Sequence, residues 1–177
     1  VAYPLKSPPV VDGILSEEIW GNLVPATNFT LMWPQTRNGK KIPMKYETIA
    51  YLGYDQNAIY IGAILKHPNP DNIPKEFSQR DEIWNVNAET FFVTFNTYND
   101  DLNFFGFQIT SAGTVGDVYS SGSIESDDFL YDTVFDAKTH FTSEGWSVEM
   151  AIPYSAIRFP EKDKQLWGLN FGRKIQS

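Results

Sequence analysis

Residues 81–96 read DEIWNVNAETFFVTFN, and the rest of the chain is best interpreted outward from this stretch. Its second half predicts a strand with one buried face, because Phe91, Val93 and Phe95 recur at every second position and side chains alternate across a strand. Its first half is polar and carries Trp84, which predicts an exposed loop. We therefore expect a tryptophan-bearing loop joined directly to a core strand.

Trp84 has two interpretations at this point. An aromatic ring on a loop of a rigid β-scaffold can stack on a sugar, while neighbouring amides and acids bind the sugar hydroxyls. Alternatively, the ring closes one end of the core, because tryptophan side chains are largely buried on average. The solvent exposure of Trp84 distinguishes the two interpretations.

Length, charge and composition narrow the function. A chain of 177 residues suits one domain, residues 1–177, and the start at Val1 suggests a fragment of a longer protein. The absence of cysteine excludes disulfides and thiolate chemistry without locating the protein in a compartment. A net charge of −8 argues against a nucleic-acid partner, which requires clustered basic residues. No apolar run approaches the roughly 18 residues of a membrane span.

The strand pattern predicts an all-β fold. Aromatic residues make up 15% of the chain, and β-branched residues are frequent in the apolar runs. One short helix is expected after residue 16, and residues 116–131 are expected to form a polar loop. Besides the strand that carries Phe91, we expect strands at residues 28–33, 44–54, 58–66, 103–110, 134–141, 146–152 and 166–175. About nine short strands with almost no helix predict an antiparallel β-sandwich, jelly-roll-like, with two sheets packed face to face.

Small or polar residues occupy the positions that alternate with the apolar set on three of these strands. They are Thr90, Gly106, Gln108, Thr110, Gly168, Asn170 and Gly172. If the strands adjoin, these positions form a shallow polar floor on the outside of one sheet. The alternative is an ordinary solvated sheet face, in which more Lys and Glu and fewer glycines are expected.

No motif assigns a catalytic centre or a cofactor. Glycoside hydrolysis requires two carboxylates about 5 to 9.5 Å apart across a cleft. The adjacent pairs Asp81 with Glu82 and Asp127 with Asp128 point to opposite sides of an extended chain. The sequence has no Gly-x-Ser-x-Gly motif and no zinc-ligand spacing. Calcium on the acid-rich loops is an open alternative to plain turn chemistry, and no calcium ligand is assigned.

A set of motifs, in the same order along the chain, resembles family 9 carbohydrate-binding modules. They are Val11-Asp12-Gly13 with Glu18-Ile19-Trp20, residues 58–62, residues 80–84, residues 145–154 and residues 167–171. They resemble more closely the amino-terminal domain of a group of bacterial proteins, common in Bacteroidetes. In that group a carboxy-terminal region predicted to be an outer-membrane β-barrel follows the module. The resemblance implies a jelly-roll β-sandwich that binds carbohydrate, such as a glycan chain end, in the periplasm or at the outer membrane.

The resemblance also implies site residues, which we transfer one position at a time. Trp84 corresponds to the first of two tryptophans that clamp a sugar in the family, and the second is expected beyond Ser177. Asn87 and Thr90 stand where the family carries acids, Gln108 stands where it carries an arginine, and a family glutamine falls near Gly172. With the polar floor included, the predicted carbohydrate-binding residues are Trp84, Asn87, Thr90, Gln108, Asn170 and Gly172.

The sequence thus favours a non-catalytic carbohydrate-binding module of a cell-envelope protein, linked to glycan capture or breakdown. One alternative is a structural or assembly domain that covers or docks to the carboxy-terminal region of the same protein. A second alternative is a part of a glycoside hydrolase whose catalytic residues lie elsewhere in the parent protein. The first function predicts an exposed Trp84 above a polar floor, whereas the assembly function predicts a buried Trp84 and an apolar patch elsewhere.

Overall fold

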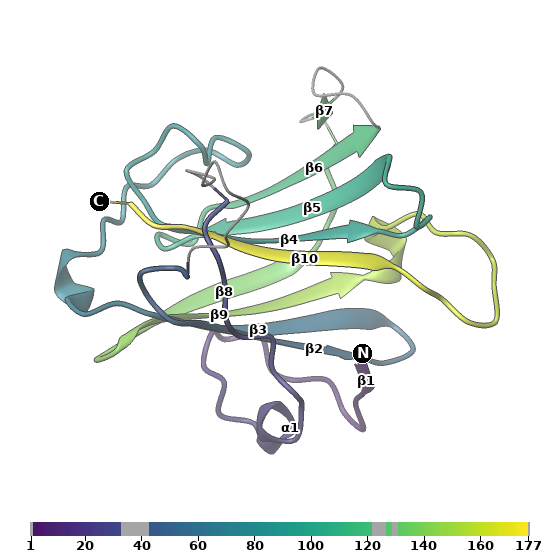
Figure 1. Ribbon diagram of the computed structural model, residues 1–177, viewed down its shortest axis with the longest axis horizontal. Helices are drawn as coiled ribbons and strands as arrows, with labels where there is room; N and C mark the ends of the chain where they lie inside the picture. Colours follow the sequence, from purple (N-terminus) through teal and green to yellow (C-terminus); the bar gives the residue numbers. More distant parts are fainter. Residues whose placement is uncertain (1, 33–42, 122–126, 129–130, 177) are drawn as a thin grey trace.

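A computed structural model describes residues 2–32, 43–121, 127–128 and 131–176. It consists mainly of two β-sheets packed face to face (Figure 1). The first sheet has the order β1-β2-β3-β9-β8, with bounds Tyr3–Pro4, Thr48–Tyr54, Ala58–Lys66, Gly145–Pro153 and Asp136–Thr142. The second sheet has the order β10-β4-β5-β6-β7, with bounds Gly168–Lys174, Thr90–Asn96, Asn103–Thr110, Val115–Ser121 and Asp127–Asp128. The predicted β-sandwich is confirmed, and among the described strands only the short β1 pairs in parallel.

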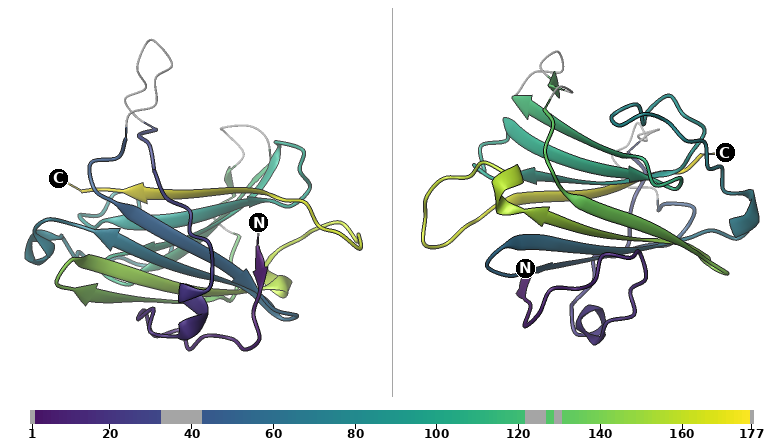
Figure 2. Two further views of the ribbon diagram at one scale, coloured as in Figure 1. Left: turned by 60° about the horizontal axis from the view of Figure 1, so that its bottom comes forward. Right: turned by 180° about the vertical axis from the view of Figure 1, so that it is seen from behind.

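Helical structure in the described residues is short. The elements are α1 (Glu18–Gly21) and the 3₁₀ turns η1 (Pro70–Asn72) and η2 (Tyr154–Ala156). Figures 1 and 2 show that α1 lies on the outer face of the first sheet. No helix in this part of the chain is long and apolar enough to span a membrane.

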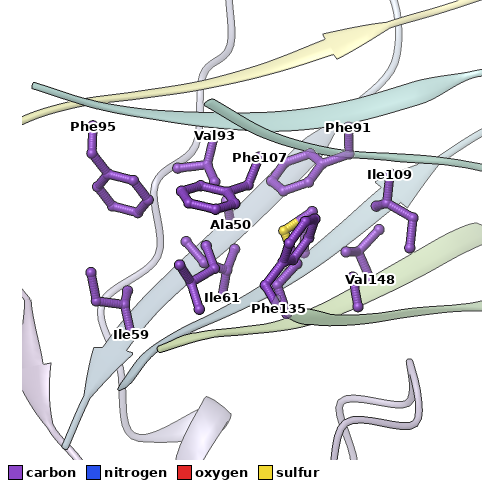
Figure 3. Close-up of a cluster of buried hydrophobic side chains, with 14 of the residues drawn as sticks. Ala50, Ile59, Ile61, Phe91, Val93, Phe95, Phe107, Ile109, Phe135 and Val148 are labelled. Atoms are coloured by element: carbon purple, nitrogen blue, oxygen red, sulfur yellow. The ribbon is translucent and has the colours of Figure 1, made fainter. Parts of the chain in front are cut away.

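The core lies between the sheets and is built from the inward-facing positions of the central strands. Figure 3 shows Phe91, Val93 and Phe95 of β4 facing Ile59 and Ile61 of β3 across this interior. The inward residues of β5, Phe105, Phe107 and Ile109, are buried in the same cluster. The predicted alternation in β4 and β5 is therefore confirmed, and their remaining residues belong to the outer face.

Two hairpins also follow the sequence pattern. β2 and β3 pair in register across a turn that joins the two strands expected at residues 44–54 and 58–66, and β8 pairs with β9. β3 is buried on both faces, because Ala58 and Tyr60 pack outside the sheet against Trp20 and Leu23. The amino-terminal segment thus seals the outer face of the first sheet.

Two predicted segments are wrong in detail. Residues 28–32 form only an isolated bridge, Thr30 with Pro43, because Asn28 has a positive φ of 60° that interrupts an extended strand; Trp33 lies outside the described residues. The expected polar loop at residues 116–131 instead contains β6, whose Asp117 is buried. Asp117 is compatible with a strand here because Arg80 forms an ion pair with it.

A buried carboxylate connects motifs that are far apart in the sequence. The Glu149 side chain accepts hydrogen bonds from the backbone N–H groups of Asp12 and Gly13 and from the indole N–H of Trp20, at 2.9 to 3.0 Å. Burial raises the pKa of Glu149, and these three donors oppose that rise. The amino-terminal motifs and the β9 motif therefore serve the fold, since they satisfy one buried charge.

A second buried acid ties the end of β10 to the core. Glu89 accepts hydrogen bonds from the guanidinium of Arg173 at 2.7 Å and from the indole N–H of Trp146 at 2.8 Å. Arg173 also donates to the carbonyl of Lys66 at 2.9 Å, which belongs to the opposite sheet. This contact fixes β10 and the start of β4 relative to the first sheet.

Candidate functional site

The loop between η1 and β4 crosses the outer face of the second sheet and is anchored on β6 (Figure 1). The Arg80 side chain pairs with Asp117 and donates to the carbonyl of Thr133 at 2.7 Å. The next residue, Asp81, accepts a hydrogen bond from the backbone N–H of Asp117 at 3.0 Å and donates its own N–H to Val115. The Arg80-Asp81 motif therefore acts as an anchor for the loop.

The loop also packs onto the sheet through one buried side chain, Ile83. A Cβ added at Gly116 would lie 2.9 Å from Ile83 Cδ1 and 3.1 Å from an Asp81 oxygen, so only glycine allows this close approach. Burial raises the pKa of the neighbouring Asp117, while Thr133 and Arg80 lower it. These contacts fix the position of the residue that follows Ile83, which is Trp84.

Trp84 is 45% exposed and stands on the outer face of the sheet, where β4 and β10 adjoin. Its ring centroid lies 6.1 Å from that of Phe92, at an interplanar angle of 60°. Lys174 donates a hydrogen bond to the Trp84 carbonyl at 2.9 Å. Phe92 lies over Gly172, because a Cβ added at Gly172 would be 2.0 Å from Phe92 Cζ. We call Trp84 and Phe92 the aromatic pair. Its exposure excludes the interpretation in which Trp84 closes the core.

The predicted site residues divide into exposed and buried groups. Asn87 and Asn170 are exposed like Trp84, and Gly172 is half-buried beside Phe92. Thr90 is 0% exposed and Gln108 4% exposed, so neither presents its side chain to solvent in this arrangement. Thr90 Oγ1 and Gln108 Oε1 have no hydrogen-bond partner among the described residues. A direct role of Thr90 and Gln108 in binding stays a prediction.

The strand register brings the positions of the expected floor together. Thr90 pairs with Thr110, Gln108 with Phe92, and Phe92 in turn with Gly172. One step further along the strands, Asn170 pairs with Thr94, and Thr94 with Gly106. The predicted adjacency is confirmed, but the face is more aromatic than the sequence pattern indicated.

Sequence reasoning missed Phe92 and Lys174. The signal for Phe92 was present, because it alternates with Phe91 and Val93 and must therefore face outward from a strand whose inner face is the core. An outward aromatic next to small residues on the neighbouring strand is a candidate for ligand contact. The role of Lys174 depends on a backbone carbonyl brought close by the fold, so no local pattern indicates it.

The two acidic residues that follow Arg80 differ in their surroundings. Asp81 is engaged by the backbone of β6, and Glu82 is exposed beside it. Within the described ranges, no group of three His, Cys, Asp or Glu side chains is placed to hold a metal ion. The acids considered for calcium, Asp127, Asp128 and Asp132, lie within those ranges, as does the Asp71-Asn72 loop, and calcium binding there stays untested.

Comparisons with known proteins identify the fold. No family model and no curated protein sequence matches the chain. Among solved structures, a family 9 carbohydrate-binding module from Caldicellulosiruptor kristjanssonii in complex with cellotriose superposes with a TM-score of 0.60 at 18% identity, covering 97% of this chain and 74% of that one. A family 9 module from the same organism in complex with glucose gives a TM-score of 0.58 at 18% identity, with the same coverage. A candidate carbohydrate-binding protein from Bacteroides uniformis gives 0.69 at 14% identity, covering 96% and 80%. The chain therefore has the fold of family 9 carbohydrate-binding modules.

Proposed function

We propose that this domain is a carbohydrate-binding module in which the aromatic pair contacts the face of a sugar ring. The observation that carries the proposal is the exposed Trp84 ring, which is held from β6 through Arg80 and Asp81 and from β10 through Lys174. The same fold in two of its structural neighbours binds cellotriose and glucose.

The chemistry of the site suits a neutral sugar. A sugar ring presents C–H groups on its face and hydroxyls at its edge, so a flat aromatic ring binds the face and amides bind the edge. Asn87 lies on the loop that carries Trp84, and Asn170 lies on β10, on the sheet face that carries Phe92. Both side chains are exposed and supply such amides. A net charge of −8 disfavours polyanionic ligands.

Replacement of Trp84 by alanine tests this function directly. Binding of glucose and cellotriose, and of a wider glycan array, should be lost because the stacking surface is removed. The unfolding midpoint should stay nearly constant because the ring is exposed. Calorimetric titration measures the first quantity and thermal unfolding the second. Tyr54→Ala, at a comparably exposed aromatic on the other sheet, is the control and should change neither.

Two outcomes would contradict the proposal. Unchanged glycan binding by the Trp84→Ala protein would remove Trp84 from the site. A midpoint lowered by several degrees, with no glycan bound by the wild type, would instead support the assembly alternative, in which Trp84 is part of a packed interface. The exposure of Trp84 in the isolated domain counts against that alternative.

The biological setting is a further part of the proposal and rests on the sequence resemblance. We place the domain in the periplasm or at the outer membrane, in a protein that captures glycans or participates in their breakdown. The carboxy-terminal region of the full-length protein is the expected partner of this domain. Cell fractionation of the full-length protein, and a hydrolase assay with and without this domain, test these points separately.

A further inference from the structure

The outer face that carries the aromatic pair continues to a groove near the turn between β4 and β5. This groove has a volume of about 210 Å³. Its described walls are formed by Thr94, Asn96, Asp101, Phe104, Gly168, Leu169 and Asn170. None of the predicted site residues except Asn170 belongs to it, so it is distinct from the position of Trp84.

The groove and the aromatic pair are aligned along one strand. Phe92, Thr94 and Asn96 all project from the outer face of β4, and the first and last are four residue steps apart, about 14 Å along the strand. Asn170 pairs with Thr94 between the two ends, which makes the face continuous. In Figure 1, β4 runs from the end near the Trp84 loop to the end near the turn to β5. A ligand longer than one sugar ring can therefore contact both ends.

The groove combines an aromatic surface with hydrogen-bonding groups. Phe104 is half-buried on the outer face of β5 and offers apolar contact area. Thr94, Asn170 and Asp101 offer a hydroxyl, an amide and a carboxylate around that area. This combination of one apolar surface and several short polar side chains is typical of small-molecule sites.

Asn96 provides an independent indication of a ligand. It is 3% exposed, and its side-chain oxygen accepts a hydrogen bond from the N–H of Asp100 at 3.1 Å. Its Nδ2 finds no acceptor among the described residues, although it lies in the lining of the groove. Unpaired buried donors are rare because they cost free energy. A small rotation of the covered Asn96 amide toward the groove would let a ligand hydroxyl oxygen supply the missing acceptor.

The charge of the groove limits the class of ligand. Its described lining residues include one acid, Asp101, and no Lys, Arg or His. A phosphate or a uronic acid would therefore meet repulsion without a compensating cation. A neutral polyhydroxylated chain meets only hydrogen-bonding partners and apolar surface.

We infer that this groove is a second sugar subsite, so that the domain binds a neutral glycan chain laid along β4. One sugar residue contacts the aromatic pair, and another, further along the chain, contacts Phe104 and the amides of Asn96 and Asn170. This inference rests on the proposed function, because the first subsite is the one at Trp84. It adds a requirement that the proposed function lacks, namely that affinity grows with chain length.

The test compares glucose, cellotriose and cellohexaose by calorimetric titration. Wild-type affinity should rise with the length of the chain, and Phe104→Ala should lower the affinity for cellohexaose by about tenfold, as expected for one aromatic contact. The loss should be much smaller for glucose, which the aromatic pair binds alone. Leu102→Ala, an exposed apolar residue in the same turn but outside the groove, is the matched control and should leave the affinity for all three unchanged.

The possible results separate the subsite from the proposed function. Equal affinity of the wild type for glucose and cellohexaose, or a Phe104→Ala protein that keeps full affinity for cellohexaose, would overturn the second subsite and leave the first intact. Equal losses for glucose and cellohexaose would also overturn it, because they would indicate a general structural effect. If none of the three probes binds, or if Trp84→Ala binds them all normally, the proposed function itself fails.

Discussion

The outer faces of the two sheets differ in the exposure of the tryptophan that each one carries. On the first sheet Trp20 is 2% exposed, and its indole N–H donates to Glu149, a carboxylate whose two oxygens are both hydrogen-bonded. On the second sheet Trp84 is 45% exposed, and the buried polar atoms Thr90 Oγ1, Gln108 Oε1 and Asn96 Nδ2 find no partner in the described structure. On the first sheet the buried Glu17 Oε2 also lacks a partner among the described residues, so the two faces differ mainly in how far each is covered.

The difference arises from what crosses each face. The amino-terminal segment brings α1 and two backbone donors onto the first sheet, which closes it with apolar side chains around one satisfied charge. The loop before β4 covers only part of the second sheet, through Ile83, and Trp84 and Asn170 stay exposed on that sheet. The first face therefore contributes to stability, whereas the second presents the exposed ring on which the proposed function rests.

The sharpest test of this comparison replaces each of the two tryptophans by alanine. Trp20→Ala should lower the free energy of unfolding by about 3 to 5 kcal/mol, because it opens a cavity and removes a donor from the buried Glu149. Trp84→Ala should lower it by less than about 1 kcal/mol, because an exposed ring leaves no cavity. Urea denaturation measures both values. Equal losses of unfolding free energy in the two variants would show that the two tryptophans are packed alike and would contradict the difference between the faces.

A smaller effect is expected where the aromatic pair meets β10. Gly172→Ala places a Cβ in the space of the Phe92 ring and forces that ring to move, which should cost about 1 kcal/mol of stability and weaken sugar binding severalfold. Calorimetric titration and urea denaturation measure the two effects. Gly21→Ala is the control, because a Cβ there meets no atom within 4 Å. Unchanged affinity in the Gly172→Ala protein would exclude Phe92 from the site.

Most of the fold could be predicted because the alternation of apolar residues within each strand indicates which of its faces is buried. Phe91, Val93 and Phe95 alternate with outward residues, and the hairpins at β2 with β3 and at β8 with β9 are local. β6 could not be predicted, because Asp117 makes it appear solvated until Arg80, far away in sequence, pairs with the carboxylate. The local sequence pattern is therefore sufficient to predict a strand only when no buried charge on that strand requires a partner far away in the sequence.

The candidate site was less predictable for the same reason. The exposure of Trp84 depends on anchors at Asp117 and Lys174, which lie 33 and 90 residues away along the chain. Thr90 and Gln108 have the residue types of a binding site, yet the fold buries both. The outward alternation of Phe92 and Phe104 was visible in the sequence, but only the register of β10, β4 and β5 shows that they share a continuous face.

A further effect, of about the same size as that of Gly172→Ala on stability, concerns the outer face of the first sheet and depends on pH. Tyr60 packs beside Trp20, and its hydroxyl donates to Asp55 at 3.1 Å. Burial and this hydrogen bond to a carboxylate raise the pKa of Tyr60 from 10.0 to about 12. Because the neutral phenol is favoured in the folded state, its stabilisation is complete below pH 10 and is lost as the pH rises through 12.

Tyr60→Phe isolates that contribution. The substitution should lower the free energy of unfolding by about 1 kcal/mol below pH 10, since one hydrogen bond is removed while the ring stays in place. The difference between wild type and variant should shrink as the pH rises from 10 to 12, because only the wild type loses the neutral phenol. Urea denaturation at a series of pH values measures it, with Tyr98→Phe, at an exposed ring, as the control at neutral pH. A difference that stays constant up to pH 12 would show that burial and the hydrogen bond to Asp55 do not raise the pKa of Tyr60 in the folded state.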